Sequence, residues 1–180
     1  MLFTTACALL IGSVYGQTYS ATMGVYPGYN TSAAGAFTTS GTVGVTAAGT
    51  SLTLAIDLTG ADSACPQAGQ CGVHIHTGTS CSDASTVGGH FYATATDPWS
   101  AVTPYTSGTP STITVDANLT INQVVGRAIV AHGASGTRLA CGLIVSSPSP
   151  PANPPSTSGT AATSLSASLF MLLAIYVRLF

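Results

Sequence analysis

The sequence has almost no charged side chains. Its 180 residues include no lysine and no glutamate, and charged residues make up only 4% of the chain. Nucleic-acid binding needs a cluster of lysine or arginine side chains, so we exclude a nucleic-acid partner. Low charge together with many Ser, Thr, Gly and Ala residues indicates an extracellular, glycosylated β protein.

A sustained helical pattern is also missing. Between residues 17 and 147, no segment keeps apolar residues at positions i, i+3, i+4 and i+7. Short alternating or β-branched runs appear instead, separated by clusters of turn-forming residues. They predict strands near residues 18–26, 34–39, 41–47, 51–58, 71–76, 111–117, 124–132 and 138–146. Eight short strands with polar turns predict an all-β antiparallel sandwich or flattened barrel.

Both ends of the chain resemble processing signals. Residues 1–16 are apolar and predict a secretory signal peptide, although they lack a basic residue. A buried N-terminal strand is the alternative. Residues 148–158 form a Pro/Ser/Thr-rich stalk, and residues 159–180 match a GPI-attachment signal that is removed, with Ser156, Ser158 or Gly159 as the attachment residue. A retained membrane helix is the alternative, and either anchor places residues 17–147 at the cell surface or wall.

Cysteines and glycosylation sequons agree with secretion. Cys7 would leave with the signal peptide, and an even number of cysteines in a secreted chain implies disulfides. Three pairings are possible for the four that remain, which are Cys65, Cys71, Cys81 and Cys141. Asn30 and Asn118 begin N-glycosylation sequons.

All four histidines of the chain lie in two stretches. Residues 71–90 read CGVHIHTGTSCSDASTVGGH, and residues 126–142 read GRAIVAHGASGTRLACG. His74 and His76 alternate with apolar residues, so on a strand both imidazoles point to one face, roughly 7 Å apart. Neutral imidazoles at this spacing suit Cu, Zn, Fe or Ni. Surface histidines on a solvated strand are the alternative.

Taken together, the two stretches resemble the Cu/Zn superoxide dismutases. The shared order is GVHIH, a cysteine, GGH, then GRAIVAH and TRLACG, within a similarity that covers most of residues 34–145. The resemblance implies an eight-stranded antiparallel Greek-key β-barrel. It also implies four copper ligands, which are His74, His76, His90 and His132.

Further roles follow from the same resemblance. Arg138 would bind the incoming anion beside the copper, or it could be a structural arginine that bonds loop carbonyls. Cys81 and Cys141 would form the disulfide of the family, which leaves Cys65 and Cys71 to pair locally. His90 would carry a proton when it leaves the reduced copper.

Two departures from the family pattern are informative. No histidine lies between His90 and His132, so zinc cannot bind in the family's manner. Only GASGT separates His132 from Arg138, where zinc-containing members have a long charged electrostatic loop. The chain therefore looks most similar to the copper-only, GPI-anchored extracellular superoxide dismutases. This implies an open copper site with superoxide as substrate, and we expect a monomer.

Without zinc, another group must hold His90. A carboxylate could accept a hydrogen bond from its far ring nitrogen, and only Asp83 and Asp97 are near in sequence. We favour Asp97, although an aspartate before Pro98 could simply begin a turn. The expected activity converts superoxide to O₂ and H₂O₂ by Cu(II)/Cu(I) cycling. The alternative is a non-catalytic copper-binding surface module, and a zinc-only structural site would leave Arg138 unexplained.

Overall fold

A computed structural model of the chain describes residues 17–61 and 71–147. These residues belong to one structural unit. The expected signal peptide, stalk and GPI signal lie outside the described residues, as does Cys65. Within the described residues, no helix is long and apolar enough to cross a membrane.

Eight antiparallel strands form a curled sheet, which confirms the all-β prediction. Their order is β4-β6-β7-β1-β2-β3-β5, and the short β8 pairs with β1. Their bounds are β1 (Tyr19–Val25), β2 (Ser40–Ala48), β3 (Ser51–Thr59), β4 (Val73–Ile75), β5 (Ser111–Val115), β6 (Ala128–His132), β7 (Arg138–Leu143) and β8 (Val145–Ser146).

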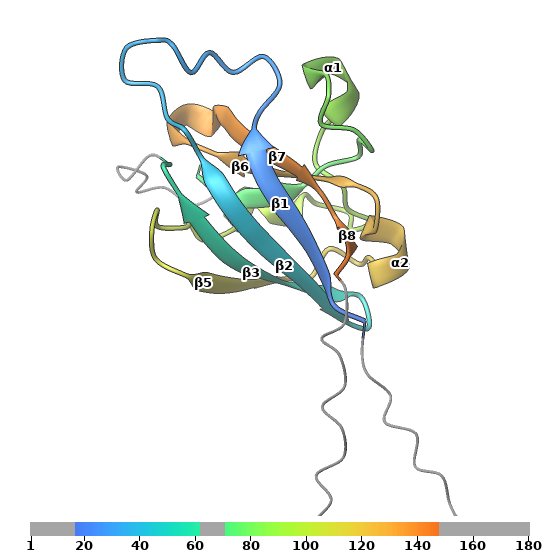
Figure 1. Ribbon diagram of the computed structural model, residues 1–180. Coiled ribbons are helices and arrows are strands. Elements are labelled where there is room, and N and C mark those ends of the chain that lie inside the picture. The colour runs from blue at the N-terminus through green and yellow to red at the C-terminus, as the bar shows by residue number, and fades with distance from the viewer. Residues whose placement is uncertain (1–16, 62–70, 148–180) are drawn as a thin grey trace, which may run out of the picture. The chain divides into compact units, whose positions relative to one another are not determined.

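The sheet folds into two layers because β1 takes part in both. Its first five residues pair with β2, whereas Gly24 and Val25 pair with β7. In Figure 1, β1, β2 and β3 lie in front of β6 and β7. The chain passes from β3 to β4, returns to β5 beside β3, and passes back to β6 beside β4. These crossings are Greek-key connections, as predicted.

Strand alternation separates the core from the face that carries histidines. On β3, four aliphatic side chains are at most 2% exposed and alternate with more exposed neighbours. They pack with Val73 and Ile75 of β4, and burying one such side chain contributes roughly 1.5–3 kcal/mol. His74 lies between these two residues and therefore points to the opposite face, where it is paired across strands with Val130. Val130 belongs to a second cluster that also contains Tyr26 and Cys141.

Three strand predictions were wrong in detail. Residues 34–39 form no strand: Gly35 has φ 74°, and the Phe37 N–H donates to the Tyr29 hydroxyl at 3.0 Å instead of joining a ladder. The strand predicted at 124–132 begins only at Ala128, because residues before it form the one-turn helix α2 (Ile121–Val124). The strand predicted at 138–146 is divided into β7 and β8.

Three more one-turn helices interrupt the loops. They are α1 (Ala84–Val87), η1 (Pro98–Ala101) and η2 (Ala134–Gly136). Each lies in a connection that approaches the histidines, and two of them also add a buried side chain to the apolar clusters, Val87 from α1 and Trp99 from η1.

Candidate metal centre

All four histidines of the chain converge on one point. Each offers a ring nitrogen, and the four nitrogens lie within 4.8 Å of one another. His74 comes from β4, and His76 follows it in a bridge with His90. His132 ends β6, so residues 58 positions apart in sequence meet because β4 and β6 are paired.

Hydrogen bonds orient three of the imidazoles. Nδ1 of His76 lies 3.1 Å from the Gly88 carbonyl oxygen, and Nδ1 of His132 lies 3.0 Å from the Gly136 carbonyl oxygen. Nδ1 of His90 lies 2.7 Å from Oδ2 of Asp97. Since carbonyls and carboxylates only accept, each Nδ1 must carry the proton. The three Nε2 atoms are then left with lone pairs that can bind a metal.

His74 is oriented differently. Neither of its ring nitrogens has a hydrogen-bond partner among the residues that the structure describes, although the side chain is 1% exposed. A β-carbon at Gly72 would collide with Nε2 of His74, so this nitrogen faces backbone and Nδ1 remains for the cluster. An unsatisfied buried nitrogen is costly, and a metal ion would satisfy it.

Burial keeps three of the histidines neutral. It lowers the pKa of His74 to about 2, that of His76 to about 3 and that of His132 to about 4, with the neighbouring histidines adding to the effect. Nε2 of His76 and Nε2 of His132 are 3.2 Å apart. Two lone pairs that face each other at this distance repel, and a cation between them relieves the repulsion. The donor set therefore fits copper, which imidazole nitrogen suits.

The centre opens to solvent at His90. Its side chain is 24% exposed and that of Asp97 is 30% exposed, whereas the other three histidines are buried. Asp97 also begins η1, because its Oδ1 accepts the Trp99 N–H at 2.9 Å. Asp97 thus makes both contacts that the sequence suggested: it begins the turn before Pro98, and it contacts His90.

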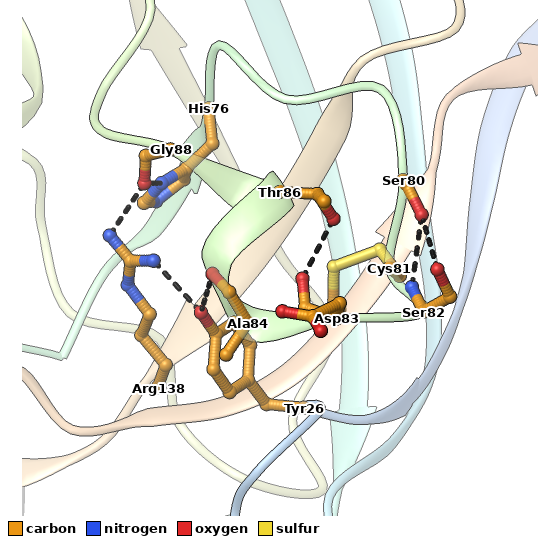
Figure 2. Close-up of a disulfide and its surroundings, with 11 residues drawn as sticks. Tyr26, His76, Ser80, Cys81, Ser82, Asp83, Ala84, Thr86, Gly88 and Arg138 are labelled. Atoms are coloured by element: carbon orange, nitrogen blue, oxygen red, sulfur yellow. Dashed lines mark hydrogen bonds between the residues drawn. A yellow bond between two sulfur atoms is a disulfide. The ribbon is translucent and has the colours of Figure 1, made fainter.

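Arg138 lies beside the histidines and is fixed at two points. Its Nη2 donates to the Gly88 carbonyl at 2.7 Å, and its Nη1 donates to the Tyr26 hydroxyl at 2.9 Å (Figure 2). The Gly88 carbonyl is the same acceptor that orients His76. The β6–β7 register shifts between Ala131 and His132: Ala131 pairs with Ala140 and His132 pairs with Arg138, so the extra residue lies on β7 and Arg138 is set opposite His132.

A disulfide holds the loop that carries this carbonyl. Cys81 is bonded to Cys141 on β7, across 60 residues of sequence. It fixes α1 and the residues up to Gly88 against the strand that begins with Arg138 (Figure 2). The loop after His132 is as short as expected, with η2 between Gly133 and Thr137.

Other residues suggested by the sequence lie elsewhere. Asp83 is exposed and caps α1 by accepting the Ser85 N–H at 2.7 Å, so it does not hold His90. Asn30 and Asn118 are both exposed, as a glycan acceptor requires. The expected pairing of Cys71 stays a prediction, because Cys65 is outside the described residues.

Sequence reasoning missed two residues near the centre. Tyr26 contacts Arg138 across 112 positions of sequence, and no motif marks it. Trp99 is fully buried with its ring 6.0 Å from that of His74, and its indole N–H donates to the Phe91 carbonyl at 2.8 Å. As the only tryptophan of the chain, Trp99 could have been noticed, but nothing in the sequence gave its contacts.

Comparisons with known proteins show a relative by structure but none by sequence. No family model and no curated protein matches the sequence. A mutant form of Candida albicans superoxide dismutase 5 matches the structure with a TM-score of 0.50 and 18% identity, over 74% of this chain and 94% of that chain. The Cu(II) form of the same enzyme matches with a TM-score of 0.47 and 21% identity, over 77% and 98%. The first of these matches shows that the chain shares the fold of a superoxide dismutase, which the resemblance in the sequence implied.

Proposed function

We propose that this protein is an extracellular copper-dependent superoxide dismutase with no zinc site. The observation that carries the proposal is the group of four histidine nitrogens within 4.8 Å of one another, three of them set by an Nδ1 contact to an acceptor and the fourth on His74 without one. Arg138, a permanent cation, lies at the same carbonyl as His76. A structural zinc site would need no such cation.

The proposed ligands are His74, His76, His90 and His132. Copper bound there supplies one-electron chemistry, in which Cu(II) oxidises one superoxide to O₂ and Cu(I) reduces a second to H₂O₂. Arg138 attracts the anionic substrate and orients it through its remaining N–H groups. The buried position of three ligands excludes water from one side and leaves access on the side of His90.

His90 and Asp97 supply the proton step in this proposal. The reduction to H₂O₂ consumes protons, and His90 is the most exposed of the four histidines. Asp97 accepts from Nδ1 and keeps the ring in place while Nε2 gains and loses a proton. In this reading the carboxylate replaces the zinc that holds the equivalent histidine in other members of the family.

The proposed location is the cell surface. The apolar residues 1–16, the Pro/Ser/Thr-rich segment and the apolar tail support secretion and a GPI anchor, and the exposed Asn30 and Asn118 are compatible with glycans. The Cys81–Cys141 disulfide supports an oxidising compartment. A non-catalytic copper-binding module on the same fold is the competing function.

The test is superoxide dismutation by the purified, copper-reconstituted protein, with metals counted on the same samples. We expect about one copper and no zinc per chain. His132→Ala should lose copper and turnover together. Arg138→Ala should keep copper but lose about ten- to a hundred-fold in activity, since a charged hydrogen bond contributes about 1.5–3 kcal/mol.

Arg127→Ala is the control for lost charge. Its guanidinium donates to the Gln123 and Thr77 carbonyls and lies over the Phe91 ring, so it does not reach the substrate side. Turnover should therefore survive this substitution wherever the variant folds. Tight copper binding without turnover in the unsubstituted protein would favour the binding module, and zinc bound beside copper would contradict the proposed ligand set.

A further inference from the structure

We infer that Tyr26 is a positioning residue whose hydroxyl fixes the Arg138 guanidinium in the orientation that binds the anion. The inference rests on the proposed function, because it concerns the group that would bind superoxide. It assigns a role to a residue that lies outside both histidine-bearing stretches.

The hydroxyl of Tyr26 has both of its hydrogen-bonding roles filled. It accepts from Nη1 of Arg138 at 2.9 Å and donates to the Ala84 carbonyl at 3.3 Å. The side chain is 8% exposed and packs with Val87 and Cys141. Figure 2 shows it between Arg138 and the first residue of α1. A buried phenol with a donor and an acceptor partner has one preferred orientation.

Two anchors determine the plane of the guanidinium. The Gly88 carbonyl holds Nη2 at 2.7 Å and Tyr26 holds Nη1 at 2.9 Å. A planar guanidinium held at both terminal nitrogens cannot rotate about either contact, and its other N–H groups are directed away from the anchors. With the Gly88 contact alone, the plane could swing about that hydrogen bond.

Tyr26 also joins three segments that must keep their relative positions. It follows β1, contacts the start of α1, and holds the first residue of β7. The ring centroid is 5.6 Å from Cζ of Arg138, a contact that phenylalanine would preserve. The substitution Tyr26→Phe therefore removes the hydroxyl and leaves the packing intact.

The matched control is Tyr29→Phe. The Tyr29 hydroxyl also takes part in hydrogen bonding in a nearby loop, but it accepts the Phe37 N–H and has no contact with Arg138. Both variants lose one oxygen atom from a tyrosine that packs against the same cluster. A loss of stability common to both is thereby separated from an effect on Arg138.

The first readout uses the metal-free full-length protein labelled with ¹⁵N-arginine. Arg127, anchored at the Gln123 and Thr77 carbonyls, serves as an internal reference. We expect the guanidinium N–H signals of Arg138 to be resolved in the unsubstituted protein and in Tyr29→Phe, and to be averaged by rotation in Tyr26→Phe. Unchanged Arg138 signals in Tyr26→Phe would overturn the inference.

The second readout is azide affinity of the copper-loaded protein, followed by absorption. Tyr26→Phe should weaken azide binding about ten-fold at unchanged copper content, since the anion must then reorient a mobile guanidinium. In the Arg138→Ala background, Tyr26→Phe should have no further effect, because Tyr26 acts through Arg138. Independent, additive losses would overturn the inference.

The two proposals fail in different ways. A copper-loaded protein that does not dismutate superoxide contradicts the proposed function. The ¹⁵N-arginine comparison still decides whether Tyr26 orients Arg138, since it needs neither copper nor turnover.

Discussion

At the scale of single residues, Asp97 divides its carboxylate between two partners. Oδ2 accepts from Nδ1 of His90 at 2.7 Å, and Oδ1 accepts the Trp99 N–H at 2.9 Å. The second contact begins η1 and so fixes where the first contact can form. One side chain therefore links the fold of the loop to the orientation of a proposed ligand.

Replacing Asp97 by asparagine tests this link. Asp97→Asn can still cap η1 through its amide oxygen, but it loses the negative charge beside His90. We expect copper affinity or turnover to fall about 10–100-fold, the usual effect of removing the partner of a metal-bound histidine. Copper titration and dismutation assays on the same preparation measure it.

Asp83→Asn is the matched control. Asp83 caps α1 by accepting the Ser85 N–H, in the same way that Asp97 caps η1, but it contacts no histidine. This variant should change copper binding and turnover by less than two-fold. Equal losses in the two variants would mean that capping, rather than the contact with His90, is responsible.

The buried histidines predict a pH-dependent stability of the metal-free protein. In the folded state the pKa values of His74, His76 and His132 lie at about 2, 3 and 4, below the ordinary value of 6.5, because burial disfavours the charged form. The unfolded chain therefore binds more protons below pH 6.5, and stability is lost as the pH falls from 6.5 towards 4.

Each such histidine should contribute about 1.4 kcal/mol per pH unit within this window. Urea unfolding at pH 8, 7, 6 and 5 measures the effect, which should be small above pH 7. His132→Ala should reduce the slope by the share of one histidine. A free energy of unfolding that does not change between pH 7 and 5 would contradict the buried, neutral imidazoles.

At the scale of elements, the loop from α1 to His90 is organised by one glycine. Gly88 has φ 72°, and a β-carbon there would collide with Oγ1 of Thr77. Its carbonyl serves both His76 and Arg138. A displacement of this one peptide would therefore disturb a proposed ligand and the proposed anion-binding group together.

Gly88→Ala should destabilise the protein by about 1–3 kcal/mol through backbone strain and should weaken both copper binding and activity. Thermal unfolding and copper titration measure the two effects. Gly89→Ala is the control, since a β-carbon at Gly89 meets no atom within 4 Å. If both substitutions have the same small effect, the positive φ of Gly88 is not required.

The elements also show where the sequence was sufficient and where it failed. Strands with strict alternation, such as β3, were predicted within one residue of their ends. Residues 34–39 have strand-like composition, but a left-handed glycine and a bond to a tyrosine hydroxyl prevent pairing. The start of α2 had a visible signal, because Thr120 and Gln123 form a capping box, but a β-branched run outweighed it in the sequence.

At the scale of the whole molecule, metal binding should stabilise the fold. The four proposed ligands come from β4, from the connection between β4 and β5, and from β6. Copper would therefore join segments that are distant in sequence. A ligand at 100 times its Kd stabilises by about 2.7 kcal/mol. We expect copper to raise the unfolding temperature by roughly 5–15 °C.

Trp99 provides a local probe for the same titration. It is the only tryptophan of the chain, and its ring is 6.0 Å from that of His74. Its fluorescence should be quenched at one equivalent of Cu(II) and much less by Zn²⁺, which has no redox chemistry. His132→Ala should lose the stabilisation and the stoichiometric quenching. Their persistence would place copper elsewhere.

The candidate site was largely predictable from sequence because its ligands are rare residue types. Four histidines in 180 residues leave few alternative groupings, and the structure brings all four together. Contacts made by common residues were not predictable. The Tyr26 hydroxyl reaches Arg138 only because β1 crosses from one layer to the other, which no local pattern records.

The short loop between His132 and Arg138 has a kinetic consequence. Gly133 to Thr137 carry no charge, and the other described arginine is engaged by the Gln123 and Thr77 carbonyls and the Phe91 ring. Among the described residues, Arg138 is then the one cation that faces an approaching anion, and at physiological salt its field is screened within about 8 Å. Ionic strength should therefore change the capture rate only slightly, so the proposed enzyme would capture superoxide nearly as fast at high salt as at low salt.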